Sequence, residues 1–401
     1  MVETNETPTG ALHNTKVLDL TIFGAGPVST MLLGDMGADV VKLERPVTGD
    51  MARWNGPLVE DMGGYFPAFN RNKRSITLNV YTPKGKELFK ELVNWADVVV
   101  ENFRPGTIER WGFPFETLQT INKRLILVSI SGFGQTGPYS QRTSFDTVGQ
   151  ASGGMMAVTG QAEGHPIAAG APIADLTGGL FGTIGTLLAL HYLHTSGKGQ
   201  WVDVSMMEGM IYFMGLPLVR HARLGPSPEV NEGIPGNKST FLTKDGSWII
   251  ILSQDDNHWR PLSRIIGRPE LSEDPKYNSR ASRMAQGGQF LRDVIQEWVS
   301  TVTLAEAEEV LETNSIPFSK AMTIQDLLKD PHVESRNAIH HLSLPTSEVV
   351  PVPGVFPKMS ESPGSVRLPS PRLGEHNKEI YGDILGVSDE ELEQLRSEQI
   401  I

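Results

Sequence analysis

Short apolar runs alternate with amphipathic stretches along roughly the first 215 residues of the chain. Strands are predicted at 16–20, 39–44, 75–80, 97–100 and 125–129. Helices are predicted between them, from Pro27 to Gly37, from Thr82 to Ala96 and over 107–121. Pro27 suits a first helical turn and Gly37 suits the position just past a last one. Strands that alternate with helices in this way predict a mostly parallel, doubly wound sheet.

The pattern changes near residue 224, where a stretch rich in glycine and proline, 224–237, is predicted as a linker. Beyond it, 240–243 and 247–252 flank a Lys-Asp-Gly turn and predict a β-hairpin. Helical segments are predicted at 257–266, 281–300 and 303–313. Together these elements predict a small α+β domain, which is followed by a loop-rich stretch and an acidic helical tail.

The charge balance narrows the classes of partner. Lys and Arg total 35 against 47 Asp and Glu, a net charge of −12, whereas a nucleic-acid or anionic-membrane binder needs a basic face. One anionic small molecule held by local cations is still compatible with this balance. The chain has no cysteine, which excludes disulfides, zinc–thiolate sites and cysteine nucleophiles. This composition and the polar N-terminal stretch, which lacks a secretory signal, predict a cytoplasmic protein.

One uncharged stretch, 176–197, approaches the length of a membrane span. It contains five glycines and two histidines, so a buried core helix is favoured over a span. Gly178, Gly182 and Gly185 fall at helical spacing and would allow close helix packing. The ten histidines of the chain form no set with metal-ligand spacing, so no metal site is predicted.

Two candidate anion sites follow the first strands. Gly24 and Gly26 come after the first strand, and Glu44 ends the second, where a Rossmann domain binds a dinucleotide and its ribose. Because the third glycine of that pattern is missing, an ordinary tight turn is the alternative to a nicotinamide site. A group of cations could bind phosphate, with a solvated surface as the alternative: Arg71, Lys73 and Arg74, with Arg45 and Arg53 nearby in sequence.

Two polar side chains stand where α/β proteins bind ligands. Asn102 lies in the turn directly after the strand at 97–100. Asp175 precedes the uncharged helix, so two roles are open: a helix N-cap, which its residue type favours, or a carboxylate nucleophile. In the second role the helix N-terminus would favour the anion, and the N–H groups near Gly178–Gly179 or near Gly132–Gly134 could meet an oxyanion.

Together and in this order, these features resemble the family III CoA-transferases. This family contains formyl-CoA:oxalate, carnitine and benzylsuccinate CoA-transferases and the α-methylacyl-CoA racemases. The resemblance covers essentially the whole chain. The stretches that carry it are VLDLT (17–21) with Gly-Pro at 26–27, GADVVKLERPVTGD (37–50), NRNKRSITL (70–78), ADVVVENFRPGTIERWGF (96–113), SISGFGQTGPY (129–139), GKGQWVDVSM (197–206) and PRLGEHN (371–377).

The resemblance implies an α/β fold with a Rossmann-like large domain, built from residues 1–223 and 326–401, and an inserted small α+β domain over 224–325. It also implies an interlocked dimer, either of two identical chains or with a related subunit. The family's catalytic aspartate corresponds to Asp175. Its CoA contacts correspond to Phe23, Ala25, Arg45, Leu78, Asn102, Phe103, Arg110 and Trp111.

The implied activity is transfer of CoA from an acyl-CoA donor, such as succinyl-CoA, to a carboxylic acid, with CoA as substrate and no tightly bound cofactor. The racemases' catalytic histidine corresponds to Phe145, which cannot move a proton. The glycine run of the formyl-CoA transferases is reduced to Gly233 and Gly236. The transferase branch is therefore favoured over two alternatives, a racemase or epimerase of the same family and a non-catalytic partner subunit.

The residues expected near the acyl group are mostly apolar, which favours an aryl or alkyl carboxylate over a very small diacid. They are Phe23, Trp54, Phe145, Met155, Met156, Met206 and Met207.

Overall fold

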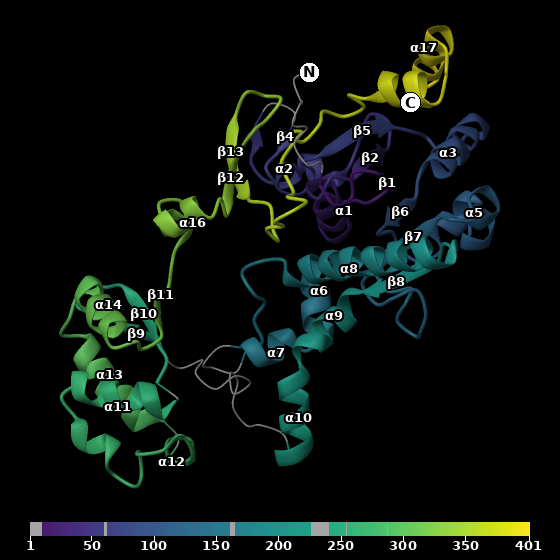
Figure 1. Cartoon of the computed structure of the whole chain (residues 1–401). Helices are drawn as coiled ribbons and strands as arrows, with labels where there is room; N and C mark the ends of the chain where they lie inside the picture. Colours follow the sequence, from purple (N-terminus) through teal and green to yellow (C-terminus); the bar gives the residue numbers. More distant parts are fainter. Residues whose placement is uncertain (1–9, 60–61, 161–164, 226–239, 254, 287) are drawn as a thin grey trace. The chain divides into compact units, whose positions relative to one another are not determined.

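The structure, a computed structural model, describes residues 10–59, 62–160, 165–225, 240–253, 255–286 and 288–401 (Figure 1). The chain forms two compact units, one made of 1–219 together with 332–401, and the other of 220–331. The larger unit therefore combines the two ends of the chain. The domain boundaries expected after residues 223 and 325 differ from these divisions by a few residues.

A six-stranded sheet forms the centre of the larger unit, in the order β5-β2-β1-β6-β7-β8. Every neighbouring pair is parallel, which confirms the predicted α/β fold. The strand order reverses between β1 and β6, and such a switch point opens a crevice at the carboxyl ends of the strands. The strands are β1 (Lys16–Asp19), β2 (Asp39–Glu44), β5 (Lys73–Thr77), β6 (Val98–Glu101), β7 (Ile126–Ser131) and β8 (Trp201–Ser205).

Helices cover both faces of the sheet, and most of its strand residues are therefore buried on both sides. One face packs against α3 and the C-terminal helices through Phe89 and Ile380, and the other against α1 and α8 through Leu33 and Ala189. The remaining elements up to α10 are α1 (Ala25–Asp35), η1 (Met51–Trp54), β3 (Leu58–Val59), β4 (Met62–Gly63), α2 (Tyr65–Phe69), α3 (Pro83–Trp95), α4 (Thr107–Trp111), α5 (Phe115–Ile121), α6 (Asp146–Ser152), α7 (Met155–Thr159), α8 (Ile173–Ser196), α9 (Met206–Phe213) and α10 (Gly215–Leu224).

The glycine face of α8 lies in the core, as the spacing predicts. A Cβ atom on Gly179 would lie 2.8 Å from the Ala25 carbonyl oxygen, and one on Gly182 would lie 2.6 Å from Cδ1 of Ile130. Real Cβ atoms do not come this close, so only glycine lets the backbone of α8 approach α1 and β7. By length and composition α8 could also cross a membrane, yet this face of the helix packs inside the protein.

The C-terminal segment adds itself to the edge strand β5. The His376 N–H donates to the Ser75 carbonyl over 2.9 Å, and the Asn377 side chain accepts from the Thr77 N–H over 2.9 Å. The Tyr381 hydroxyl donates to the Thr77 carbonyl over 2.8 Å. The elements of this segment are α16 (Pro331–Ser335), β12 (Ile339–Ser343), β13 (Val349–Pro353), the π-helical η3 (Lys378–Ile384) and α17 (Asp389–Ser397).

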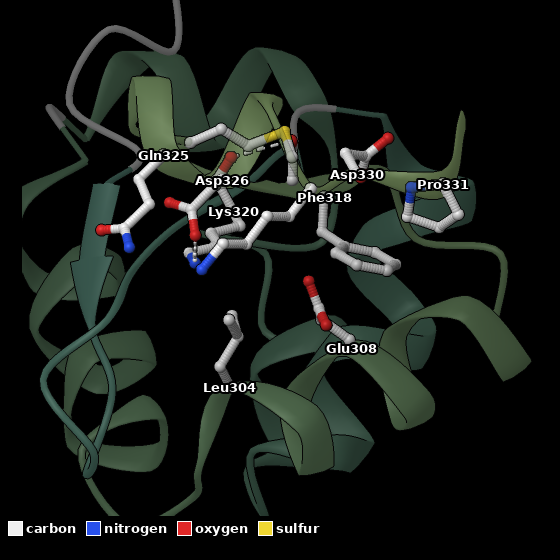
Figure 2. A pocket seen from close by; sticks show the side chains of 11 residues that line it. Leu304, Glu308, Phe318, Lys320, Gln325, Asp326, Asp330 and Pro331 are labelled. Atoms are coloured by element: carbon white, nitrogen blue, oxygen red, sulfur yellow. Dashed lines mark hydrogen bonds and ion pairs between the residues drawn. The ribbon is translucent and has the colours of Figure 1, made fainter. Parts of the chain in front are cut away.

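The smaller unit has an antiparallel sheet in the order β11-β10-β9, and β9 and β10 form the predicted hairpin. Its helices pack around the fully buried Trp259. A cavity of about 620 Å³ lies beside β11, where Lys320 Nζ is 2.6 Å from Asp326 Oδ1 (Figure 2). The elements are β9 (Thr240–Leu242), β10 (Trp248–Ile251), α11 (Asp256–Ile265), η2 (Pro269–Ser272), α12 (Arg280–Ala285), α13 (Gln289–Val299), α14 (Leu304–Thr313), β11 (Phe318–Lys320) and α15 (Ile324–Leu327).

Two helices predicted as continuous are divided in the structure. Gly112, with φ of +95°, separates α4 from α5 within 107–121, and Gly288, with φ of +65°, precedes α13 within 281–300. Gly112 follows the last turn of α4 and ends that helix, whereas Gly288 is the N-cap of α13. The apolar periodicity alone reveals neither break. The strand expected at 75–80 begins earlier and ends at Thr77.

Candidate active site

Asp175 lies in the first turn of α8, where the N-cap residue is Pro172. It does not cap the helix itself. Asp146 does so from 29 residues earlier in the chain, because its Oδ1 atom accepts the N–H groups of Ala174 (2.8 Å) and Asp175 (3.2 Å). The N-cap role considered for Asp175 is therefore wrong. Within the described residues no donor is bonded to the Asp175 carboxylate, so both oxygens are available for chemistry.

Burial makes this carboxylate unusually basic. The Asp175 residue is 8% exposed. Burial, and after it the charge of Asp146, raises the pKa of Asp175 from 3.8 to about 7. The helix N-terminus favours the anion, but the loss of hydration outweighs that effect. A carboxylate that ionises near neutral pH is suited to nucleophilic or proton-transfer chemistry.

The backbone at Gly24 lies next to the Asp175 carboxylate. A Cβ atom there would lie 2.3 Å from Oδ2 of Asp175 and 3.0 Å from the Tyr65 hydroxyl. A side chain at this position would therefore displace the Asp175 carboxylate, and the Tyr65 hydroxyl lies close to the same point. Burial, followed by the charge of Asp175, raises the pKa of Tyr65 to about 12. Tyr65 thus stays protonated and can donate a hydrogen bond, a role that its isolated position in the sequence gave no reason to expect.

Aromatic rings surround this point. The ring of Phe23 lies 5.2 Å from that of Tyr65 and 6.0 Å from that of Phe145, measured between centroids. Phe145 is 58% exposed, so this edge is open to a ligand. Of the other residues expected near the acyl group, Trp54 lines the large cavity described below. Met206 is buried and packs against Gly178, one turn along α8 from Asp175.

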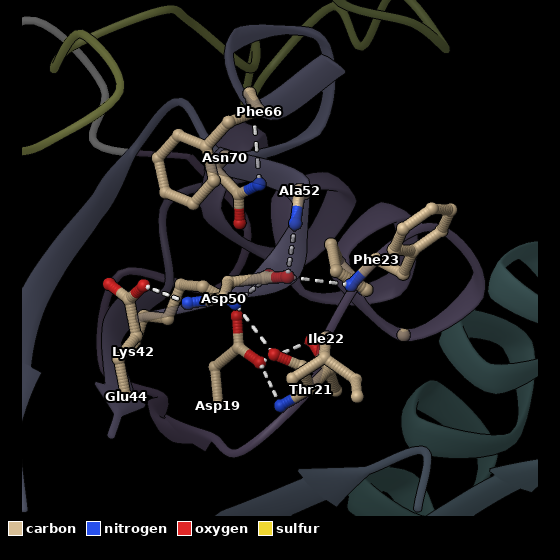
Figure 3. A network of polar contacts seen from close by, with 12 residues as sticks. Asp19, Thr21, Ile22, Phe23, Lys42, Glu44, Asp50, Ala52, Phe66 and Asn70 are labelled. Atoms are coloured by element: carbon tan, nitrogen blue, oxygen red, sulfur yellow. Dashed lines mark hydrogen bonds and ion pairs between the residues drawn. The ribbon is translucent and has the colours of Figure 1, made fainter. Parts of the chain in front are cut away.

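Two side chains hold the turn that precedes Gly24. The Asp50 carboxylate accepts the Phe23 N–H over 3.0 Å (Figure 3). The Asn102 side chain accepts the Ile22 N–H and donates to the Ile22 carbonyl, both over 2.8 Å. Asn102 directly follows β6 and Ile22 lies in the loop after β1, so these two hydrogen bonds join the loops on either side of the switch point of the sheet. The amide of Asn102, for which a contact with CoA is expected, thus forms its hydrogen bonds with the backbone of Ile22.

A cavity of about 830 Å³ opens at the same carboxyl edge of the sheet. Four of the expected CoA contacts line it: Arg45, Leu78, Phe103 and Trp111. Arg110 lies next to it and donates to the hydroxyl of Thr107, a lining residue, over 2.7 Å. The other three expected contacts are not among its lining residues: Phe23 and Asn102 lie at the turn beside Asp175, and Ala25 is buried at the start of α1.

Most of the cations considered for phosphate binding are buried in ion pairs. Arg71 lies 2.7 Å from Asp35, and Lys73 lies 2.9 Å from Asp19, with no more than 1% of these side chains exposed. Neither the phosphate interpretation nor the solvated surface fits these two residues. Arg45 differs, since it is exposed and has no ion-pair partner within the described residues.

The dinucleotide interpretation also fails. Glu44, placed to bind a ribose, accepts two hydrogen bonds from the buried Arg53, at 2.7 and 2.8 Å, and one from Ser75. Its oxygens therefore have protein partners. Arg74 is likewise paired, with Asp39 and Glu379.

Two further expectations concern glycines and metals. The N–H groups of Gly178 and Gly179 lie inside α8, where helical hydrogen bonds use them, so they cannot serve as oxyanion donors. Gly233 and Gly236 fall outside the described residues. Among the residues that the structure describes, no group of three or more His, Asp or Glu side chains could hold a metal ion.

The sequence model of CoA-transferase family III matches residues 12–377. The chain belongs to this family. It is 35% identical to the succinyl-CoA–D-citramalate CoA-transferase of Chloroflexus aurantiacus, over 99% of this chain and 100% of that protein. It is 36% identical to the succinyl-CoA–L-malate CoA-transferase beta subunit of the same organism, over 98% of this chain and 99% of that subunit. The solved structure of a CAIB/BAIF family protein from Brucella suis matches with a TM-score of 0.82 and 32% identity, over 94% of this chain and 99% of that one.

The buried carboxylate of Asp175 should make the folded protein less stable at high pH. Asp175 is neutral in the fold below about pH 7 but ionised in the unfolded chain above 3.8, so the folded state binds more protons in this window. Stability is therefore full below about pH 4 and falls as the pH rises to about 7. Asp175→Asn should raise the free energy of unfolding by about 2–4 kcal/mol at pH 8 and leave it unchanged at pH 4.

Urea unfolding at the two pH values measures this difference. Asp383→Asn, at an exposed acid on η3, is the matched control and should show no pH-dependent gain. An Asp175→Asn variant that is no more stable than the wild type at pH 8 would contradict the raised pKa.

Proposed function

We propose that this family III CoA-transferase moves CoA from an acyl-CoA thioester, with succinyl-CoA as a donor, to a carboxylic acid, with Asp175 as the nucleophile. The observation that carries the proposal is the buried carboxylate of Asp175, without a bonded donor and beside Gly24. The cavity at the same edge of the sheet supports a large cofactor-like substrate. Two relatives are named for succinyl-CoA, which supports that donor.

The first half of the reaction transfers CoA to the enzyme. An Asp175 oxygen attacks the thioester carbonyl, the carbon–sulfur bond breaks, and CoA leaves as a thiolate. The product on the enzyme is a mixed anhydride of the acyl group and Asp175. The thiolate then attacks the Asp175 carbonyl, which forms an aspartyl-CoA thioester and releases the acyl group as a carboxylate.

The second half repeats these steps in reverse. The acceptor carboxylate attacks the aspartyl thioester, the thiolate leaves again, and a second mixed anhydride forms. Attack of the thiolate on the acceptor carbonyl gives the new acyl-CoA and returns Asp175 as a carboxylate. Each step exchanges one acyl bond for another, so the thioester energy is retained and neither ATP nor a net proton is consumed.

Tyr65 and Gly24 support the first step. Negative charge develops on the carbonyl oxygen as Asp175 attacks, and a hydrogen-bond donor placed there lowers the barrier. The Tyr65 hydroxyl is such a donor, because its pKa is raised to about 12 and it lies on the same side of Gly24 as Asp175. The absence of a side chain at Gly24 lets the Asp175 carboxylate lie directly against the backbone of this turn.

CoA binding is assigned to the 830 Å³ cavity. The protein carries a net charge of −12 and CoA is an anion, so affinity must come from local cations and from apolar contact. Arg45 and Arg110 supply the cations. Phe103 and Trp111, whose rings are 5.2 Å apart, supply an aromatic surface for the base. In this arrangement Phe23 and Ala25 lie toward the thioester end, and Asn102 acts through the Ile22 backbone.

The acceptor is proposed to be an aryl or alkyl carboxylate. Phe23, Tyr65 and Phe145 form an apolar wall with a single hydroxyl donor. Phe145 stands where the racemases have their catalytic histidine and has no titratable group, so the transferase role is preferred to racemisation. A cytoplasmic location stays a prediction from composition.

A dimer is proposed because α8 carries an exposed apolar stripe. Leu180, Ile184, Leu188 and Tyr192 recur at intervals of four residues and are 43–65% exposed. Tyr212 of α9, whose ring lies 5.5 Å from that of Phe181 of α8, is 73% exposed and extends the stripe. Apolar surface of this kind is characteristic of an interface. A second copy of this chain, or a related subunit such as the relative named as a beta subunit, would cover it.

Asp175→Ala should lose more than 95% of the transfer rate, roughly the loss expected when a nucleophile is removed. Binding of CoA should stay within a few-fold, since the cavity is unchanged. Wild type and variant are compared with succinyl-CoA and acetyl-CoA as donors and a panel of carboxylic acids, read by mass spectrometry. Borohydride or hydroxylamine trapping should modify the peptide 172–179 in the wild type only, and an adduct on another acid would refute the assignment.

Arg45→Ala and Arg110→Ala should each weaken CoA binding by about 1.5–3 kcal/mol, the range for a lost charge-assisted hydrogen bond. The difference should shrink at high salt, because screening weakens the wild-type contact as well. Titration calorimetry measures all variants, and Lys198→Ala, on the turn after α8, is the control. Equal affinities for the wild type and both arginine variants would mean that CoA binds elsewhere.

Leu188→Asp should convert the dimer to a monomer, because it places a charge in the centre of the apolar stripe. Light scattering coupled to size exclusion measures the mass. Thr120→Asp adds the same charge to an exposed position on α5 and should leave the dimer intact. A wild-type chain that is monomeric both alone and with a related subunit would rule out the proposed interface.

A further inference from the structure

Asp50 makes contacts in two directions from a buried position. It is 1% exposed and ends the loop that follows β2. Its Oδ1 atom accepts the N–H groups of Phe23, at 3.0 Å, and of Ala52, at 2.9 Å. Its Oδ2 atom lies 2.9 Å from the ammonium group of Lys42 (Figure 3). One carboxylate thus satisfies two backbone donors and one buried charge.

Lys42, the ion-pair partner of Asp50, binds the start of the same turn at Thr21. Its side chain has no exposed surface, and it donates to the Thr21 carbonyl over 2.6 Å. Lys42 therefore fixes Thr21 while Asp50 fixes Phe23. Phe23 has φ of +67°, a backbone conformation that residues other than glycine avoid. The turn therefore needs such support to keep its shape.

The position of this turn matters because Gly24 follows Phe23. A Cβ at Gly24 would lie 2.3 Å from the Asp175 carboxylate, so any shift of the turn changes the space in which a thioester meets the nucleophile. Asp50 also belongs to the cavity assigned to CoA. It lines that cavity together with Arg45, and its own N–H donates to Glu44, another lining residue, over 2.9 Å.

We propose that Asp50 is a positioning residue that fixes the Phe23–Gly24 turn against Asp175 and links this turn to the loop that lines the CoA cavity. The proposal rests on the function proposed above. Asp50 does not touch the reacting atoms. It acts through the Phe23 backbone, so that the same carboxylate orders the CoA-binding loop and the wall of the catalytic site.

Asp50→Asn tests this directly. An asparagine has one acceptor oxygen, so it can serve the two N–H groups or Lys42 but not both, and its amide would present N–H groups to the ammonium. We expect kcat to fall at least tenfold, and KM for the acyl-CoA to change by a smaller factor. Hydrogen exchange of the peptide 20–26 should be faster in either arrangement, because either the Phe23 N–H loses its acceptor or Lys42, which donates to the Thr21 carbonyl, loses its counter-ion.

The matched control is Asp35→Asn. Asp35 is also 1% exposed and paired with a buried cation, Arg71, but it is not among the residues that line the cavity or hold the turn. It should leave kcat per folded molecule and the exchange of the peptide 20–26 unchanged. If Asp50→Asn does not fold, Asp50→Glu keeps the charge beside Lys42, moves the oxygen, and should still lower kcat at least threefold.

Three outcomes would overturn the proposal: wild-type kcat in the folded Asp50 variant, unchanged exchange at 20–26, or an equal loss of kcat in Asp35→Asn. Failure of the proposed function looks different. In that case the wild type itself transfers no CoA to any acid of the panel, whereas the exchange measurement still reports whether Asp50 holds the turn.

Discussion

The Phe23–Gly24 turn beside Asp175 depends on buried ion pairs at the carboxyl ends of the neighbouring strands. Lys42 with Asp50, and Lys73 with Asp19, are each 2.9 Å apart, and none of these side chains is exposed. Although burial opposes ionisation, Lys73 and Lys42 keep the pKa of Asp19 below its usual value, and Lys42 does the same for the pKa of Asp50. Breaking one such pair costs about 3–5 kcal/mol, a large part of the stability of a domain. The carboxyl ends of β1 and β2 are thereby held firmly.

Asp175 meets the same low dielectric without a cation, and the result is opposite. Its pKa rises to about 7 because burial comes without compensation and Asp146 adds a second negative charge. The structure thus separates two uses of a buried acid. Paired acids such as Asp19 hold the scaffold, and the unpaired one is left reactive at a cost in stability. Such a division is expected wherever a site needs a strong carboxylate base next to a rigid backbone.

The fold follows from local pattern, but the partners of the charged residues and the neighbours of Asp175 do not. Strand–helix alternation was sufficient to predict the parallel sheet, because it reflects burial of each element. The sequence does not indicate that Arg71 pairs with Asp35, 36 residues away, so a buried ion pair looks like an anion site. Likewise, the contact between Gly24 and the Asp175 carboxylate arises only when β1 and α8 come together. The hydrogen bonds between the Asn102 side chain and the Ile22 backbone arise only when β1 and β6 are neighbours.

The electrostatics of the site also bear on the order of the proposed reaction. A carboxylate acceptor that approached ionised Asp175 would meet the charges of both Asp175 and Asp146 in a poorly hydrated site, where repulsion is strong. When Asp175 carries CoA as a thioester its charge is gone, and only Asp146, which is engaged with the N–H groups of α8, is left. Acceptor binding is therefore favoured only after the donor has delivered CoA. In the proposed mechanism the site thus takes the donor's acyl group and the acceptor carboxylate in turn, and the burial that raises the pKa of Asp175 also disfavours the acceptor until Asp175 carries CoA.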